Sequence, residues 1–155
     1  MAQDLGITRG SFYWHFKSRA ELLEALLAYW EVALTDSVML ALNGDQGDAR
    51  ERLYLLMEDV FFNERSRYDM AFIAWAKEDD DVRKRVEAVL LRRRTFVTQL
   101  FRQMGFPPQE ADARSRLIVE LMFGKSLVRW KDTPRRLRAL LRQQWTLLTE
   151  GAAEE

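Results

Sequence analysis

The sequence predicts an all-α protein, and three observations support this fold class. Apolar residues recur at spacings of three and four along most of the chain, which is the period of a helix with one buried face. Almost no stretch alternates β-branched and polar residues in the manner of a half-buried strand. The 7 glycines and 3 prolines cluster between the periodic segments, where they separate one helix from the next.

The first helices are placed by their start and stop signals. Residues 1–5 have the pattern of the end of a helix that Gly6 terminates, and residues 9–16 are expected to form a short helix with Thr8 as its N-cap. Ser18 and Glu21 have the spacing of a capping box, in which the serine oxygen accepts a backbone N–H and the glutamate reaches back. A long helix is therefore predicted from Ser18 to about residue 42, followed by a loop over residues 43–47.

The later helices follow from the same kind of signal. Asp48, with Glu51 three residues on, is predicted to cap the next helix, and the apolar segment 68–77 is expected to be buried. The acidic run 78–81 precedes a helix that ends at Gly105, because carboxylates stabilise the positive end of the helix dipole. Two more helices are expected, from Pro108 to about residue 130 and from Pro134 to about residue 150, the second with Thr133 as its N-cap.

Composition excludes several classes of protein. The absence of cysteine excludes a disulfide scaffold and a thiolate zinc site, and a single histidine, His15, excludes a multi-histidine metal site. No run of 18 apolar residues and no signal-peptide pattern are present, so a soluble cytoplasmic protein with no membrane-spanning segment is expected. No cofactor is expected, and no phosphate-binding glycine loop or nucleophile–base set indicates an enzyme.

The 24 basic and 24 acidic side chains cancel, but they are not evenly distributed along the chain. Residues 1–20 hold three basic and one acidic side chain, residues 21–81 hold 5 and 15, and residues 82–155 hold 16 and 8. Neutrality is therefore an average over separated charges, and it does not argue against nucleic acid as a partner of the basic N-terminal part.

The segment from Ala2 to Leu27 carries the most informative pattern. It predicts a helix, a tight turn at Gly6, a short helix and a capped long helix, which is the arrangement of a helix-turn-helix. The short helix carries basic, hydroxyl and aromatic side chains that a small core does not need, and such side chains suit a DNA groove.

This segment closely resembles the TetR family of bacterial transcriptional repressors. Leu5-Gly6-Ile7-Thr8 matches the turn of that family, and Gly10-Ser11-Phe12-Tyr13-Trp14-His15-Phe16 matches its recognition helix. The resemblance implies a DNA-binding set, in which Arg9, Ser11 and Trp14 face bases or the sugar edge and the others hold phosphate or let the backbone approach it. The set is Thr8, Arg9, Gly10, Ser11, Tyr13, Trp14, His15 and Lys17.

The chain departs from the family pattern at its start. Residue 1 aligns within the second helix of the family's DNA-binding domain, so the first helix of that domain is absent from this sequence. We expect the start at Met1 to lie inside a longer gene product; the alternative is that the short chain is native and does not hold operator DNA in the usual geometry. The domains are expected to be a partial helix-turn-helix with a connecting helix over 1–42, a ligand-binding and dimerisation domain over 43–150, and a frayed tail over 151–155.

The last two helices each have two apolar faces, which predicts either a central position in the monomer or a face that packs on a second subunit. The homodimer is the favoured interpretation. The expected interface residues are Leu127, Trp130, Leu141, Trp145 and Leu148.

The resemblance also implies a small-molecule effector pocket in the C-terminal domain, and aromatic and methionine side chains suit such a site. Aromatic side chains at helical spacing are more often part of a plain core. An apolar or aromatic ligand, with few polar groups around it, is expected. The candidate residues are Tyr54, Met57, Phe61, Phe72, Trp75, Phe96, Leu100, Met122 and Phe123.

The run Arg92-Arg93-Arg94 is interpreted as an exposed, solvated helix face. The alternatives are pairing with Glu87 or with the acidic middle of the chain, and a nucleic-acid-binding patch. Together these features predict a ligand-responsive repressor that binds palindromic operator DNA as a dimer and is released by a small-molecule effector. The alternative is a dimeric ligand-binding or interaction protein whose incomplete helix-turn-helix does not bind DNA.

Overall fold

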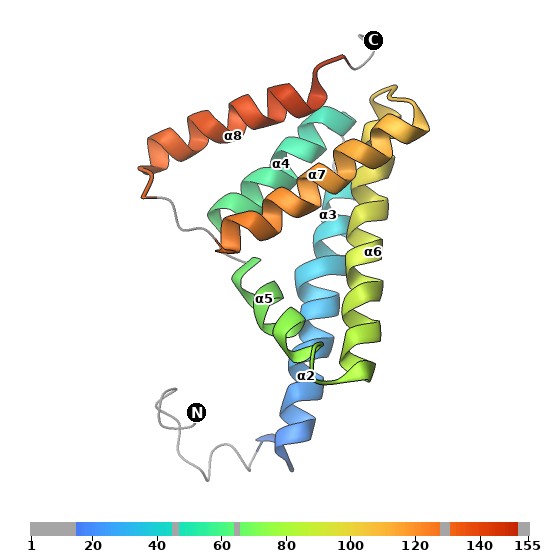
Figure 1. Cartoon of the computed structure of the whole chain (residues 1–155), viewed down its shortest axis with the longest axis vertical. Coiled ribbons are helices and arrows are strands. Elements are labelled where there is room, and N and C mark those ends of the chain that lie inside the picture. The colour runs from blue at the N-terminus through green and yellow to red at the C-terminus, as the bar shows by residue number, and fades with distance from the viewer. Residues whose placement is uncertain (1–14, 45–46, 64–65, 128–130, 152–155) are drawn as a thin grey trace.

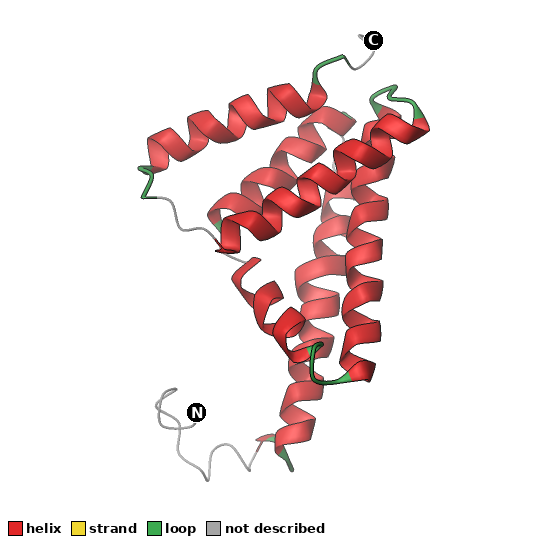
Figure 2. Cartoon of the chain, viewed as in Figure 1, coloured by secondary structure: helices red, strands yellow, loops and turns green. Residues whose placement is uncertain are grey.

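The structure of the chain, a computed structural model, describes residues 15–44, 47–63, 66–127 and 131–151. Every regular element in these ranges is helical (Figure 2), which confirms the predicted all-α class. The elements are α2 (Arg19–Glu31), the π-helical turn η1 (Val32–Asp36), α3 (Ser37–Gly44), α4 (Ala49–Phe62), α5 (Ser66–Trp75), α6 (Asp80–Gln103), α7 (Pro108–Leu127) and α8 (Pro134–Thr149).

Three helices begin where the capping signals predicted. The Glu21 amide donates to the Ser18 hydroxyl over 3.1 Å, and the Glu51 amide donates to the Asp48 carboxylate over 2.7 Å. Thr133 caps α8, with Pro134 at its first position. The capping box at α2 differs in one detail, because the Glu21 carboxylate accepts from the amide of Lys17 rather than from that of Ser18.

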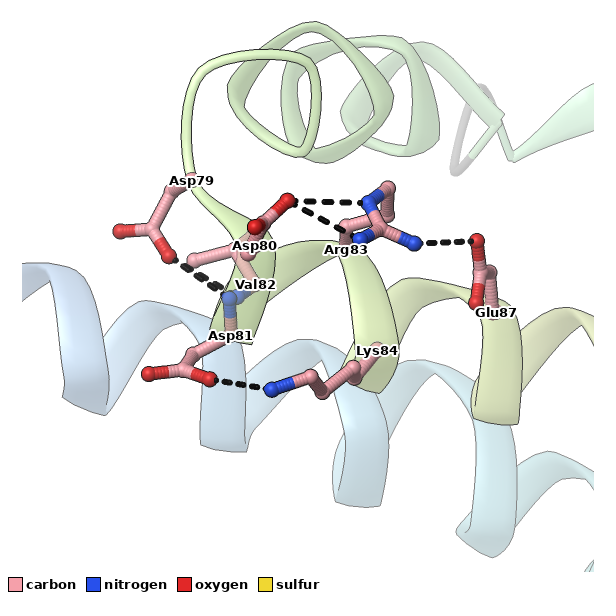
Figure 3. A network of polar contacts seen from close by, with 7 residues as sticks. All are labelled: Asp79, Asp80, Asp81, Val82, Arg83, Lys84 and Glu87. Carbon is pink, nitrogen blue, oxygen red and sulfur yellow. Dashed lines mark hydrogen bonds and ion pairs between the residues drawn. The ribbon is translucent and has the colours of Figure 1, made fainter.

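The acidic run before α6 is a helix start (Figure 3). One oxygen of the Asp79 carboxylate accepts the backbone N–H groups of Asp81 and Val82, which would otherwise lack a partner in the first turn. Arg83 and Lys84 form ion pairs with carboxylates three or four residues away along the same helix. These exposed pairs each stabilise a helix by only about 0.2 to 0.5 kcal/mol, so the cap is the main contribution of this run.

Gly105 ends α6 in a Schellman motif. Its φ of +87° lies in the left-handed region, where a side chain is strained. The Phe106 amide donates to the Phe101 carbonyl and the Gly105 amide to the Arg102 carbonyl, so two end carbonyls of the helix are satisfied. The rings of Phe101 and Phe106 meet edge to face at 5.7 Å, the apolar contact that accompanies this motif.

Replacing Gly105 by alanine is expected to lower the free energy of unfolding by about 1 kcal/mol, because alanine pays the steric cost of the left-handed conformation. Urea denaturation followed by circular dichroism measures this change. Gly44→Ala is the matched control, because Gly44 has open space around its Cα and lies within α3. Equal or greater stability of Gly105→Ala would contradict the assigned role of the glycine.

The predicted continuous helix over 18–42 is present, but it contains a π-helical turn. The Ser37 amide donates to the carbonyl of Val32, five residues back, so η1 holds one more residue than an α-helical turn would. Such insertions are frequent at functional sites. Figure 1 shows α2, η1 and α3 as one continuous rod, so the turn does not change the direction of the helix.

Two apolar clusters hold the helices together, and α6 belongs to both. The N-terminal half of α6 packs Val82, Val86 and Val89 against Leu27 and Trp30 of α2. Its C-terminal half contributes to a larger cluster with α4, α7 and α8. Figure 1 accordingly shows α2 and α3 running beside α6, with α4 and α7 near its C-terminal half and α8 packed on α4, away from α6.

The structure accounts within one chain for most of the second apolar face on α7 and α8. Leu141 is fully buried, and Trp145 and Leu148 pack against the same cluster. The Trp145 indole N–H donates to the Arg50 carbonyl on α4 over 3.1 Å. Of the residues expected at a dimer interface, Leu127 is the one that stays exposed among those described, and Trp130 lies outside the described residues. Residues 152–155 of the expected tail also lie outside them.

Candidate functional site

A cavity lies between the rod formed by α2, η1 and α3 and the helices α4, α5, α6 and α7. The space within its outline that no atom occupies is about 710 Å³, and this volume includes open solvent. Its walls are mostly aliphatic, aromatic and methionine side chains. The lining residues are Leu34, Thr35, Val38, Met39, Leu56, Asp59, Val60, Asp69, Leu90, Arg93, Phe96, Val97, Val119, Met122 and Phe123.

One part of the cavity wall is polar and buried. The Asp69 carboxylate, 4% exposed, accepts the Trp30 indole N–H over 2.6 Å and an Arg93 N–H over 2.9 Å. Arg93 also donates to the Thr35 hydroxyl in η1 from two nitrogens, over 3.0 and 2.7 Å. A buried ion pair needs such additional hydrogen bonds to offset the desolvation of its charges. This cluster, Trp30–Thr35–Asp69–Arg93, joins α2, η1, α5 and α6 at one point.

Of the nine residues expected to form a ligand pocket, Phe96, Met122 and Phe123 line the cavity. The other six lie elsewhere. Met57, Phe61 and Leu100 are buried in the larger apolar cluster, and the Tyr54 ring meets Trp145 edge to face at 5.8 Å. Phe72 and Trp75 pack in the smaller cluster, where Phe72 stacks on Trp30 at 4.8 Å.

Sequence reasoning missed the polar wall, although one signal was available. Arg93 continues the buried stripe of α6, which runs through Val86, Val89, Phe96 and Leu100 at spacings of three and four. A charged residue in phase with a buried stripe indicates a buried pair.

The interpretation of residues 92–94 as a solvated face fits Arg92 but not Arg93, and the alternative of partners in the acidic middle of the chain fits Arg92 and Arg93. Arg92 pairs with Asp36 over 3.3 Å and Arg94 pairs with Asp112, both at partly exposed positions. Arg93 pairs with the buried Asp69. The run fails as a uniform face because three consecutive residues on a helix point in three directions.

A second polar contact holds α2 against α6 outside the cavity. The Arg85 guanidinium donates to both carboxylate oxygens of Glu31, over 2.8 and 2.9 Å, and to Glu24 over 2.5 Å. The hydrogen bonds from Arg85 hold the pKa of Glu31 below its ordinary value, against the opposing effect of burial. This bidentate contact fixes the orientation of α2 on α6 as well as the distance between the two helices.

Replacing Glu31 by glutamine is expected to destabilise the protein by about 1 kcal/mol at pH 7, as expected for a half-buried charged hydrogen bond. Because the pKa of Glu31 is lower in the folded chain, its contribution is present above the ordinary value of 4.5 and is lost as the pH falls through the folded-state pKa. Urea unfolding at pH 7 and at pH 3 measures both effects.

The difference between wild type and Glu31→Gln should therefore be smaller at pH 3 than at pH 7. Glu24→Gln is the matched control, since the Glu24 side chain is 65% exposed and should contribute less. A Glu31→Gln deficit that is equal at the two pH values would contradict the pairing.

The structure describes two of the eight expected DNA-binding residues. His15 and Lys17 are both exposed, directly before α2. Thr8, Arg9, Gly10, Ser11, Tyr13 and Trp14 lie outside the described residues. In the part of the chain that the structure describes, no group of three or more histidine, cysteine or carboxylate side chains is placed to hold a metal ion.

Comparison with known proteins bears on the N-terminal segment and on the chain as a whole. The family model for "Bacterial regulatory proteins, tetR family" matches residues 1–26. The nucleoid occlusion factor SlmA of Marinobacter nauticus is 30% identical over 122 residues, which cover 74% of this chain and 62% of the relative. The nucleoid occlusion factor SlmA of Vibrio vulnificus is 27% identical over 128 residues, which cover 76% of this chain and 65% of the relative. No solved structure gives a significant match.

The N-terminal segment of the chain, residues 1–26, thus matches the TetR family. The family match ends inside α2, so it covers the N-terminal segment and the first part of the helix that carries Glu24, Leu27 and Trp30. The similarity to the relatives extends over about three quarters of the chain, well beyond the matched segment. The chain spans less than two thirds of the length of these relatives.

One helical stretch of the chain, Arg19–Gly44, is long and apolar enough, by length and composition only, to cross a membrane. This finding alone does not overturn the prediction that no segment spans a membrane. Length and composition do not separate spanning helices from helices that pack on a protein core. In this stretch Leu27 and Trp30 are buried against α6 and Glu31 pairs with Arg85.

Proposed function

We propose that the chain is a ligand-responsive transcriptional repressor that binds palindromic operator DNA as a homodimer and releases it when a small molecule fills the cavity. The observation that carries this proposal is the family match over residues 1–26, which ends in the helix that leads to the cavity. The recognition element would be residues 8–17, and the sensing and dimerisation part residues 43–150. As a DNA-binding regulator the protein would act in the cytoplasm.

The connection between cavity and N-terminal segment supports a ligand response. Thr35 and Leu34 of η1 line the cavity, and η1 continues directly into α2. A ligand that changes the position of η1 would therefore act on the same helical rod whose other end carries the recognition element. A ligand shifts such an equilibrium only by its differential affinity for the two positions.

A homodimer would use the exposed sides of the last two helices. Leu127 and Leu147 are each 68% exposed, at positions where a second subunit would bury them. Trp145 and Leu148 are half-buried and would extend such a surface, together with Trp130. Leu141 is buried in its own chain, so it would support the interface indirectly, by holding α8 in place.

Replacing Lys17 by alanine in the full chain is expected to weaken binding to all DNA sequences alike, because an exposed lysine next to the recognition helix contacts phosphate. Fluorescence anisotropy with labelled duplexes measures this loss. The slope of the logarithm of the binding constant against the logarithm of the salt concentration should be less steep by about 1. Tyr13→Phe should likewise weaken binding broadly. Lys131→Ala, an exposed lysine between α7 and α8, is the control and should bind as the wild type does. A loss confined to one base position would contradict the phosphate assignment.

The names of the relatives supply a second candidate, a nucleoid occlusion factor, favoured by the similarity over about three quarters of the chain. A gene deletion separates the two candidates. A repressor predicts raised transcription of neighbouring genes, whereas a nucleoid occlusion factor predicts division septa placed across the nucleoid. A dimeric protein that binds ligand but no DNA predicts neither change.

A further inference from the structure

The polar wall of the cavity contains a hydrogen-bond donor without an acceptor. A guanidinium has five N–H groups. The Arg93 guanidinium makes four hydrogen bonds, one to Asp69, two to Thr35 and a longer one to the Leu34 carbonyl. Among the residues that the structure describes, no atom accepts the second hydrogen of the nitrogen that donates to Asp69. The Arg93 side chain is 15% exposed and its guanidinium lies over the Trp30 ring, so this partly buried N–H favours a ligand that brings an acceptor.

The charges of the wall limit which acceptor fits. The charges of Asp69 and Arg93 offset each other in an ion pair, and Asp59 adds no positive charge to the wall. A ligand carboxylate would compete with Asp69 for one guanidinium, and two anions would then share a single buried cation. A ligand cation placed here would face the Arg93 guanidinium instead. An uncharged oxygen accepts the spare N–H without either cost.

The rest of the cavity determines the body of the ligand. Eleven of the lining residues are apolar, from Leu34 on η1 to Phe123 on α7. Such walls gain free energy mainly by burying apolar surface. Met39 on α3 and Met122 on α7 are both part of this lining, and their flexible side chains can adapt to a flexible ligand.

We propose that the cavity binds an uncharged molecule with an apolar body and one hydroxyl or carbonyl oxygen, which accepts a hydrogen bond from Arg93. This inference rests on the proposed function, since it names the class of effector for the same cavity. Because Arg93 also donates to Thr35, the ligand oxygen and η1 share one donor residue. Binding therefore acts directly on the turn that leads to α2.

Four eight-carbon probes that differ in their head group test this class: 1-octanol, 2-octanone, octanoate and octyltrimethylammonium. Each probe is titrated into the full chain, which is labelled with ¹³C at the methionine methyl groups. The NMR spectra then give both the affinity of the probe and the position at which it binds. The alcohol and the ketone should shift Met39 and Met122, which line the cavity, and leave Met104 in the apolar cluster unchanged. The two ionic probes should bind at least about tenfold more weakly.

The double variant Asp69→Asn/Arg93→Met tests the anchor itself. It removes both charges together, so no charge is left buried alone, and the amide oxygen of the asparagine still accepts from the Trp30 indole. Its affinity for 2-octanone should fall by about tenfold, as expected for the loss of one hydrogen bond from a charged donor. Arg92→Met is the matched control, because Arg92 pairs outside the cavity lining, and it should bind the probe as the wild type does.

Three outcomes would overturn the inference: tighter binding of an ionic probe, no shift at Met39 and Met122 with any probe, or unchanged affinity of the double variant for 2-octanone. Failure of the DNA-binding proposal is distinguished from these outcomes, because operator binding is measured without any probe. A chain that binds 2-octanone as expected but no DNA would retain this inference as a ligand-binding property.

Discussion

Replacing Arg93 by methionine is expected to lower the free energy of unfolding by about 3 to 5 kcal/mol, because it leaves the buried Asp69 carboxylate without its cation. Asp69 is 4% exposed, and among the described residues the Trp30 indole N–H would remain as its hydrogen-bond partner. Methionine keeps most of the apolar stem of arginine, so the lost charge and its hydrogen bonds cause the effect rather than a cavity. The Thr35 hydroxyl in η1 would lose its two donors in the same substitution.

Urea denaturation at pH 7 measures this loss, and the neighbouring arginine provides the control. Arg92 forms an ion pair with Asp36 in which both side chains are more than 40% exposed, so Arg92→Met should cost about 1 kcal/mol or less. The double variant Asp69→Asn/Arg93→Met should recover much of the stability that Arg93→Met loses. Equal effects of Arg92→Met and Arg93→Met would show that Asp69 is not held by a buried charge.

Replacing Leu141 by alanine is expected to lower the free energy of unfolding by about 3 to 5 kcal/mol. Leu141 is fully buried, in the cluster that joins α8 to α4 and α6. Removing a buried leucine loses its transfer free energy and leaves a cavity where the surroundings cannot collapse. Because the contact lies within one chain, the loss should be the same at low and high protein concentration.

Leu147→Ala on the same helix is the matched control for Leu141→Ala. Leu147 is 68% exposed in the chain, so its truncation should change the unfolding of the monomer by about 0.5 kcal/mol or less. In a homodimer built on α8 it should instead lower the dimer affinity. A Leu141→Ala effect that grows as the protein is diluted would place this side chain at a subunit interface rather than in the core of one chain.

The boundaries of the helices followed from local chemistry, and this is why the sequence predicted them well. Ser18, Asp48 and Thr133 cap helices through side-chain oxygens that act within three residues. Gly105 ends α6 because only glycine adopts its backbone conformation without strain. Signals of this kind depend on neighbours in the sequence and need no knowledge of the tertiary structure.

The cavity and its polar wall depend on contacts between distant segments, so the sequence predicted them only in part. Phe96, Met122 and Phe123 were selected for their chemistry and do line the cavity. Asp69 and Arg93 are 24 positions apart, and their pairing depends on how α5 packs on α6. Leu141 and Leu147 look alike in sequence, and only the packing of α8 on α4 separates the buried side chain from the exposed one. The π-helical turn likewise leaves no compositional mark.

A gel shift with the full chain and the DNA upstream of its own gene tests the central claim most directly. A palindromic site should give a discrete retarded complex with two chains per site, competed by the same unlabelled DNA and not by a scrambled duplex of equal length and composition. Equal retardation of the scrambled duplex, or no retarded complex at low salt where phosphate contacts are strongest, would contradict the claim that this chain is a sequence-specific DNA-binding regulator.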